Sequence, residues 1–160
     1  MTRLPTLSFD CPPATLVGYH GTNVEFDAFD LARAGSNFGN AISREGIFFS
    51  AEAYVAESVA DQVVEEFGGI RRVIQASLRM ERGLRLDMGG RQDAGEVLRT
   101  LTQAKAGGHD GLIIENWDDG LCAQHETQYV VFHPAQIKIL NPEKNELGKM
   151  KMTAGRRRKP

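Results

Sequence analysis

The chain has 160 residues, of which 41% are hydrophobic and 25% charged, a composition typical of one compact globular domain rather than of a disordered chain. The longest apolar runs have three to four residues, far from the roughly 20 that cross a bilayer, so we expect no contact with a membrane. The first ten residues hold no sustained apolar stretch, which argues against a secretory signal. Two cysteines, Cys11 and Cys122, are too few for a disulfide framework, so the cytoplasm is the expected location.

The charges are distributed unevenly along the chain. Residues 143–160 hold seven Lys or Arg and two Glu, a charge of +5, whereas the whole chain carries −2 and its body therefore −7. The segment lacks helical or strand periodicity, so we predict a domain at 1–142 and a flexible basic tail at 143–160. The tail is either a solubilising end or a contact for a polyanion, namely nucleic acid or an acidic partner.

The first predicted elements are a strand and a long loop. Residues 15–19 form an apolar run typical of a strand, and residues 20–22 stand at the end of that strand, where it enters the loop. Residues 23–43 are rich in Asn, Asp, Gly and Ser, which predicts a surface loop of a length that is usually functional or badly ordered. Three buried rings are expected to hold this loop to the core: Phe26, Phe29 and Phe38.

A strand and a helix are predicted next. Residues 46–49 have the composition of a strand, and Ser50 is the expected N-cap of the helix behind it. Apolar residues at three- and four-residue spacing predict that helix over 53–67, and Gly68 ends it.

The second half of the chain alternates short apolar segments with turn residues. We predict strands at 71–78, 83–87, 111–115, 127–132 and 136–140, and a helix at 94–106. Strands and helices are segregated without a regular βαβ alternation, so the predicted fold class is α+β with a mainly antiparallel sheet.

Four short blocks hold the residues best suited to chemistry: GYHGT at 18–22, EGIFFS at 45–50, GGHDGLII at 107–114 and QYVVFHPAQIKI at 128–139. In order and spacing, these blocks resemble the ADP-ribosyltransferase superfamily over residues 16–140. The resemblance is to the ADP-ribosyltransferase-like domain of polyvalent proteins of phages and conjugative elements in particular, with poly(ADP-ribose) polymerase catalytic domains as distant relatives.

The resemblance implies NAD chemistry on a split, mainly antiparallel sheet with flanking helices. In such domains the histidine of the first block, here His20, holds the adenosine-side ribose. The backbone of the following glycine, here Gly21, pairs with the nicotinamide carboxamide, and the hydroxyl of Thr22 then supports the cofactor. An imidazole can hydrogen-bond a hydroxyl, and a glycine lets a planar ligand approach the backbone, so these residue types suit the implied roles.

The second block supplies the aromatic ring of the implied site. Phe48 is placed to stack on nicotinamide, and Ser50 belongs to the same cofactor site by resemblance. Related enzymes usually carry Tyr at the stacking position, so the π-face is retained here without the hydroxyl. Phe49 should point to the other face of the sheet by strand alternation. Plain core packing is the alternative interpretation of both phenylalanines.

The last block departs from the family at its acidic position. Directly before Tyr129 stands Gln128, where the family has a glutamate that bonds the nicotinamide-ribose hydroxyl and stabilises the oxocarbenium-like transition state. Glu126 lies two positions earlier on the same strand face, with its Cα about 6.6 Å away. We therefore expect Glu126 to be the catalytic acid, Gln128 to position the ribose or the acceptor, and His20 to complete the catalytic group.

Competing sites have weaker support. Cys122 and His125 have a Cys-x-x-His spacing, but no second pair of ligands accompanies them, so we expect no metal. Asp110 and Gly111 are most simply a turn before a strand. No phosphate-binding loop or dinucleotide-binding glycine pattern occurs.

The sequence thus predicts a mono-ADP-ribosyltransferase that uses NAD as substrate, releases nicotinamide and modifies a protein or nucleic-acid acceptor. If the gene belongs to a phage, the protein would act in the host cytoplasm or in the virion. The alternative is a degenerate transferase fold that serves as a binding or virion-associated module, and the departures at Phe48 and Gln128 favour it.

Overall fold

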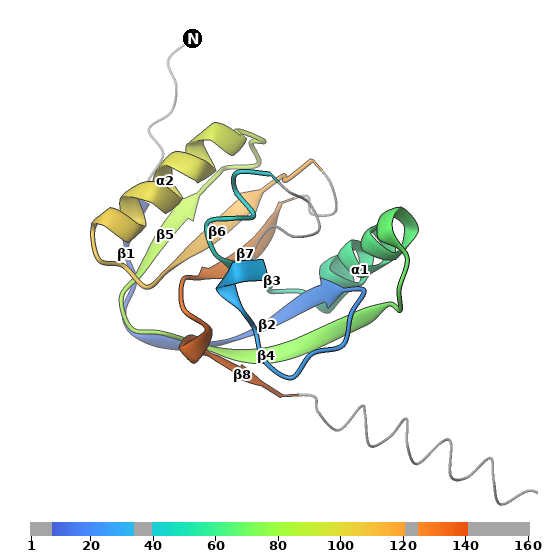
Figure 1. Ribbon diagram of the computed structural model, residues 1–160. Helices are drawn as coiled ribbons and strands as arrows, with labels where there is room; N and C mark the ends of the chain where they lie inside the picture. Colours follow the sequence, from blue (N-terminus) through green and yellow to red (C-terminus); the bar gives the residue numbers. More distant parts are fainter. Residues whose placement is uncertain (1–7, 34–39, 121–124, 141–160) are drawn as a thin grey trace, which may run out of the picture.

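The computed structural model describes residues 8–33, 40–120 and 125–140, which form one sheet with flanking helices (Figure 1). The strands are β1 (Ser8–Asp10), β2 (Ala14–Thr22), β3 (Ile47–Ser50), β4 (Arg72–Met80), β5 (Gly83–Asp87), β6 (Gly111–Trp117), β7 (Glu126–Val131) and β8 (Ile137–Ile139). The α-helices are α1 (Ala53–Phe67) and α2 (Ala94–Ala106), and the 3-10 turns are η1 (Leu31–Arg33) and η2 (Pro134–Gln136). The predicted α+β class is confirmed.

The strands lie in the order β1-β5-β6-β7-β3-β2-β4-β8. β5 and β6 pair in parallel, whereas the other six neighbouring pairs are antiparallel, so the mainly antiparallel sheet is also confirmed. β1 was not predicted from the sequence. Its three residues are all exposed and pair with β5 at the edge of the sheet, so they show no apolar alternation.

The sheet is divided between β2 and β3. These two strands are joined at one residue pair, Tyr19 with Ser50, whereas β2 pairs with β4 over nine residues and β3 pairs with β7 over four. α1 packs against β2 and β4, and α2 packs against β6, so each half of the sheet has its own helix (Figure 1). The sheet is therefore split into two halves that meet at β2 and β3.

Two apolar clusters form the core, one on each face. The cluster that includes α2 consists of Leu86, Met88, Val97, Leu101, Ala104, Leu112, Ile114, Trp117, Val130 and Phe132. The other consists of Ile47, Phe49, Ala76, Leu78, Met80, Ile113 and Val131. β3 therefore contributes side chains to both clusters, because successive residues of a strand point to opposite faces.

Residues 20–22 form the end of the first long strand, as predicted: β2 continues through Thr22, which pairs with Arg72 of β4. One predicted boundary needs correction. Ser50 does not cap α1, because it is paired with Gln128 within the sheet. Glu52 is the N-cap residue instead, and it makes no side-chain capping bond.

Other sequence predictions concern single residues. Asp110 holds a turn, as the simpler interpretation had it: its carboxylate accepts hydrogen bonds from the backbone N–H of Glu81 at 2.8 Å and of Arg82 at 3.0 Å. Phe38, Cys122 and the basic tail lie outside the described residues.

No helix in the described part of the chain is long and apolar enough to cross a membrane.

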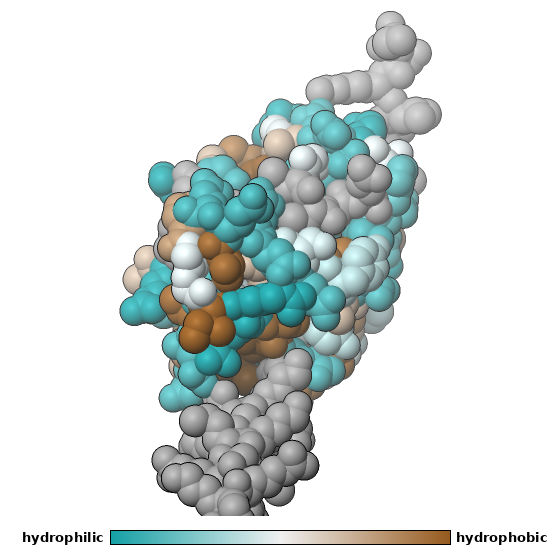
Figure 2. Space-filling view, turned by 90° about the vertical axis from the view of Figure 1, so that its right-hand side faces the viewer, coloured by the Kyte–Doolittle hydropathy of each residue, from teal (hydrophilic) through white to brown (hydrophobic). Residues whose placement is uncertain are grey.

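One face of the molecule shows apolar side chains gathered among hydrophilic ones (Figure 2). The exposed apolar residues of the chain include Val24 and, just beyond the end of α1, Ile70, which is 67% exposed. The backbone N–H of Ile70 donates to the carbonyl of Asn23, the residue before Val24.

Candidate active site

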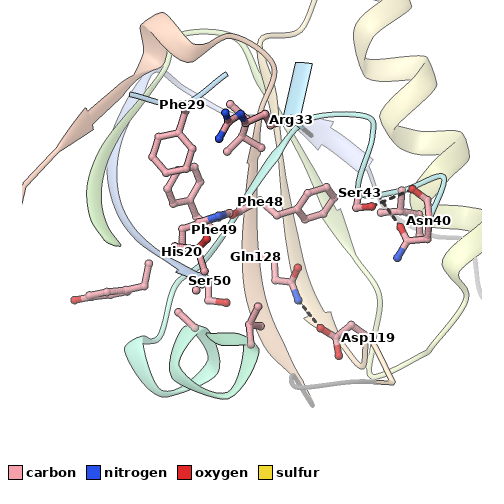
Figure 3. Close-up of a pocket in the computed structure, with 18 of the residues that line it drawn as sticks. His20, Phe29, Arg33, Asn40, Ser43, Phe48, Phe49, Ser50, Asp119 and Gln128 are labelled. Atoms are coloured by element: carbon pink, nitrogen blue, oxygen red, sulfur yellow. Dashed lines mark hydrogen bonds between the residues drawn. The ribbon is translucent and has the colours of Figure 1, made fainter. Parts of the chain in front are cut away.

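A cavity of about 1150 Å³ lies where the sheet divides. Its walls come from β2, the described parts of the segment between β2 and β3, β3, the N-terminal halves of α1 and α2, the end of β6 with the segment after it, and β7 (Figure 3). Six of the seven site residues predicted from the sequence line it: His20, Gly21, Thr22, Phe48, Ser50 and Gln128. Residues from three distant segments are therefore brought together in one cleft.

His20 is held in a defined protonation state. Its Nδ1 lies 2.8 Å from the carbonyl oxygen of Phe48, and because a carbonyl oxygen only accepts, Nδ1 must carry the hydrogen. Burial lowers the pKa of the imidazole below its ordinary value of 6.5, and the hydrogen bond to Phe48 opposes that shift without reversing it. In a neutral ring with its hydrogen on Nδ1, Nε2 is a hydrogen-bond acceptor. It can therefore accept the hydrogen of a sugar hydroxyl.

Three aromatic rings surround this imidazole. Its centroid lies 5.1 Å from that of Phe29, 5.6 Å from that of Phe49 and 6.4 Å from that of Phe26. Phe26 and Phe29 also meet edge to face, at 4.8 Å. Such contacts fix the orientation of the ring and exclude water from its surroundings. In Figure 3, His20, Phe29 and Phe49 form a group on one side of β3.

Gly21 has a packing reason to be glycine. A Cβ at this position would meet the backbone of α1, including the carbonyl oxygen of Ala56 and, at 2.7 Å, the nitrogen of Ala60. The neighbouring Thr22 is 2% exposed, and its hydroxyl lies 3.4 Å from the backbone nitrogen of Val24, from which it accepts. Both residues therefore position α1 and the start of the loop, besides lining the cleft.

Phe48 and Phe49 lie on opposite faces of β3, as strand alternation predicted. Phe49 is 1% exposed and belongs to the core cluster on the His20 side. Phe48 is only partly buried, packs against the cluster that includes α2 and lines the cleft (Figure 3). Its ring has an accessible surface on which a planar group can stack.

Gln128 is the polar centre of the other side of the cleft. Its side chain is almost fully buried, and its amide Nε2 donates to a carboxylate oxygen of Asp119 at 3.0 Å (Figure 3). Asp119 also lines the cleft, and it lies just after β6. Sequence reasoning missed this residue. The available signal was the pair of aspartates before Gly120, which a turn would explain equally well.

Glu126 occupies a different environment from Gln128. It is the first residue of β7, pairs with Trp117 and accepts a hydrogen bond from the hydroxyl of Tyr54 in α1. This hydrogen bond raises the pKa of Tyr54 above its ordinary value of 10.0. Glu126 is not among the described residues that line the cleft. The structure thus brings six of the predicted residues together and leaves the expected acid outside.

The charges that line the cleft are unevenly placed. Among the described lining residues, Arg33 is the sole Lys or Arg, and the carboxylates are Glu25, Asp30 and Asp119. Glu25 forms an ion pair with Arg72 at 3.1 Å, and Asp30 accepts from the backbone of η1. Arg33 and Asp119 lie at opposite ends of the group in Figure 3. A ligand with an anionic and a cationic part would therefore be oriented by this cleft.

Metal ligands are not grouped in this region: within residues 8–33, 40–120 and 125–140, no three His, Cys, Asp or Glu side chains are placed to hold an ion. The carboxylates of the cleft instead contact an amide, a guanidinium and a backbone N–H.

No curated protein gives a significant match. The fold is similar to that of a chain in the crystal structure of the M. tuberculosis MbcT-MbcA toxin-antitoxin complex, with 11% sequence identity, 81% of this chain and 83% of that chain covered, and a TM-score of 0.49. The family model described as ADP-ribosyltransferase in polyvalent proteins matches residues 14–146, most of the sequence. The chain therefore belongs to the family of ADP-ribosyltransferases in polyvalent proteins.

Proposed function

We propose that this protein is an NAD-dependent mono-ADP-ribosyltransferase that passes ADP-ribose to a macromolecular acceptor and releases nicotinamide. Membership of the family supports transfer of ADP-ribose as the general activity. The observation that carries the proposal is the meeting of His20, Phe48 and Gln128 in one cavity of about 1150 Å³. Small-molecule sites commonly measure roughly 300–1,000 Å³, so this cleft has room for a dinucleotide.

The residues of the cleft suggest how NAD lies in it. The adenosine-side ribose would donate a hydroxyl hydrogen to Nε2 of His20, while the accessible face of Phe48 would stack on nicotinamide. Arg33 would contact the pyrophosphate, since a guanidinium matches phosphate oxygens in both charge and geometry. Ser50 and Gln128, which face each other across β3 and β7, would then lie beside the nicotinamide ribose.

The chemistry requires one bond to break and one to form. The bond between C1′ of the ribose and the pyridinium nitrogen breaks, and its electron pair neutralises that nitrogen, so nicotinamide leaves uncharged. A nucleophilic atom of the acceptor forms the new bond to C1′ and releases its proton to solvent. The ribose carries positive charge in the transition state, and fixed negative charge or oriented dipoles near C1′ accelerate the step.

The acceptor is proposed to be a protein or a nucleic acid. The exposed apolar residues Val24, which lines the cleft, and Ile70 support an acceptor with an extended surface. The tail at 143–160 would add contact with a polyanion through its charge of +5.

A second candidate function is binding of NAD or a partner without turnover. It is favoured by Gln128, which stands at the family's acidic position, and by Glu126, which is engaged by Tyr54 outside the cleft. A neutral amide forms weaker hydrogen bonds than a carboxylate and adds no net charge beside the ribose.

Incubation of the full chain with NAD carrying separate labels on nicotinamide and adenine, in the presence of a bacterial lysate, distinguishes the two functions. Free nicotinamide together with adenine label on a macromolecule is the expected result, and protease or nuclease digestion then identifies the acceptor class. Binding of NAD in calorimetry without release of nicotinamide would establish the binding module instead. Absence of both binding and release would contradict the assignment of NAD.

A further inference from the structure

We propose that Asp119 supplies the negative charge at the reacting end of the cleft, and that Gln128 is the residue that positions it. This inference rests on the proposed function and names the residue that performs the electrostatic part of the reaction. Its basis is the contact of the two side chains, their place in the cleft wall, and the separate anchoring of the segment that carries Asp119.

The contact between the two residues is directional. Gln128 is held in the middle of β7 by pairing with Ser50 on one side and Ile114 on the other, so the strand fixes where its side chain begins. Its amide is buried and donates to Asp119 at 3.0 Å. A hydrogen bond to a carboxylate is stronger than one between neutral groups, so the amide holds the carboxylate in place without cancelling its charge.

A separate set of hydrogen bonds anchors the segment that follows β6. The backbone N–H of Asp118 donates to the carbonyl of Arg91 at 3.3 Å, and the carboxylate of Asp118 accepts from the side chain of Gln92 at 3.0 Å. The same carboxylate accepts from the backbone N–H of Gly120 at 2.9 Å. Asp118 therefore fixes the turn from outside, and Asp119, the next residue, is directed to the cleft wall.

The other carboxylates near the cleft make their contacts away from Gln128. Glu25 pairs with Arg72, Asp30 accepts from the backbone of η1, and Glu126 accepts from Tyr54 outside the lining. Among the described lining carboxylates, Asp119 is the one for which a contact with Gln128 is seen. During transfer its carboxylate stabilises the positive charge on the ribose, while the electron pair of the broken bond goes to nicotinamide and the acceptor proton to solvent.

Asp119→Asn tests this role, and Asp87→Asn is the matched control. Each carboxylate accepts from a side-chain amide at 3.0 Å, Asp119 from Gln128 and Asp87 from Asn116, but Asp119 lines the cleft and Asp87 is not among its described lining residues. We expect Asp119→Asn to lower kcat for nicotinamide release about 100-fold or more, the size of effect seen when one transition-state contact is removed, with Kd for NAD changed less than about 3-fold. Asp119→Glu should restore part of kcat, because it restores the charge.

Glu126→Gln is the competing variant. If Asp119 carries the charge, Glu126→Gln should lower kcat less than Asp119→Asn does. The inference is overturned if Asp119→Asn keeps kcat within about 3-fold of the wild type, or if Glu126→Gln produces the larger loss. A comparable loss in Asp87→Asn would also overturn it, because the effect would then belong to the loss of any carboxylate–amide hydrogen bond rather than to the charge in the cleft.

A binding measurement tests the same placement without turnover. The nicotinamide ring is cationic in NAD and neutral in NADH, so a carboxylate near the ring favours NAD. We expect Asp119→Asn to reduce the ratio of Kd for NADH to Kd for NAD about 5-fold or more, and Asp87→Asn to leave it unchanged. An unchanged ratio in Asp119→Asn overturns the inference even in a protein that releases no nicotinamide, whereas absence of release alone counts only against the proposed transferase activity.

Discussion

The two ends of the cleft are constructed on different principles. At one end, packing determines the site: His20 is surrounded by Phe26, Phe29 and Phe49, and the backbone of Phe48 fixes its tautomer. At the other end, polar contacts determine it, through the amide of Gln128 and a carboxylate that lies on a turn. Substitutions at the packed end should therefore affect stability or affinity, whereas substitutions at the polar end should affect turnover or charge.

The largest expected effect is on stability and concerns Gly21→Ala. The added Cβ would meet the backbone of α1 at Ala56 and Ala60, so helix and strand must separate. Overpacking of this kind lowers the free energy of unfolding by about 3 kcal/mol. Gly95→Ala, near the start of α2, is the control and should raise it by up to about 1 kcal/mol. Urea denaturation measures both changes, and equal stability of the two variants would refute the packing role of Gly21.

His20→Ala should weaken NAD binding more than any other single change in the cleft. Loss of one hydrogen bond in a largely dry site costs about 1 to 3 kcal/mol, which corresponds to about 5- to 150-fold in Kd. His109→Ala is a suitable control, because His109 contacts Asp10 and the carbonyl of Ala104 rather than the cleft. Calorimetry that finds unchanged affinity in His20→Ala would remove the assignment of the ribose contact.

The pH dependence of binding should follow the protonation state of His20. Its pKa is lowered in the folded protein, so the imidazole stays neutral from pH 8 to about 6.5, and affinity should be constant over that range. Below the lowered pKa the ring gains a proton, Nε2 no longer accepts, and affinity should fall by about tenfold per pH unit. Folding stability should also decrease below about pH 6.5, because the unfolded chain binds that proton first. An affinity that already falls between pH 8 and about 6.5 would contradict this account, because the imidazole would then gain its proton above its ordinary pKa.

Gln128→Glu should reveal the neighbouring carboxylate. The substitution places two carboxylates about as close as the present 3.0 Å contact, which raises the pKa of one of them in the folded state. The variant should match the wild type in stability near pH 4 and lose about 1 kcal/mol as the pH rises to 7.5. Thermal denaturation at both pH values measures the difference, and a loss that is independent of pH would argue against Asp119 as the near neighbour.

The smallest effect is expected from removal of residues 149–160. This segment lacks the apolar periodicity needed to join a core, so its deletion should leave the melting temperature nearly unchanged. Any polyanion contact it makes should weaken between low and physiological salt, because exposed charges are screened over about 8 Å at 0.15 M. Identical binding partners for the intact and truncated chains at every salt concentration would leave the tail without a recruiting role.

The regular elements were predictable where burial sets a period. The helix predictions at 53–67 and 94–106 agree with α1 and α2 residue for residue, and the strand at 83–87 agrees with β5. In each case one face packs against the sheet, and the apolar spacing records that face in the sequence. The gathering of His20, Phe48 and Gln128 was predicted from the resemblance of their blocks to a known family.

The polar contacts of the site could not be predicted in the same way. Strand alternation predicts a common face for Glu126 and Gln128, but it contains no information on where the cleft wall ends or that Tyr54 reaches Glu126 from α1. Asp119 lies in an irregular segment, whose path depends on the hydrogen bond that the Gln92 side chain donates to Asp118 and on the one that the backbone of Asp118 donates to the carbonyl of Arg91. Such contacts join distant residues and leave no periodic pattern.

The central claim is that NAD lies across the split with its adenosine half at His20 and its nicotinamide half at Phe48 and Gln128. A crystal structure of the Asp119→Asn variant with NAD tests it most directly, since that variant should bind NAD and turn it over slowly. We expect a hydroxyl of the adenosine ribose within hydrogen-bond distance of Nε2 of His20, and nicotinamide stacked on Phe48. NAD bound in the reverse direction, or outside this cleft, would contradict the account.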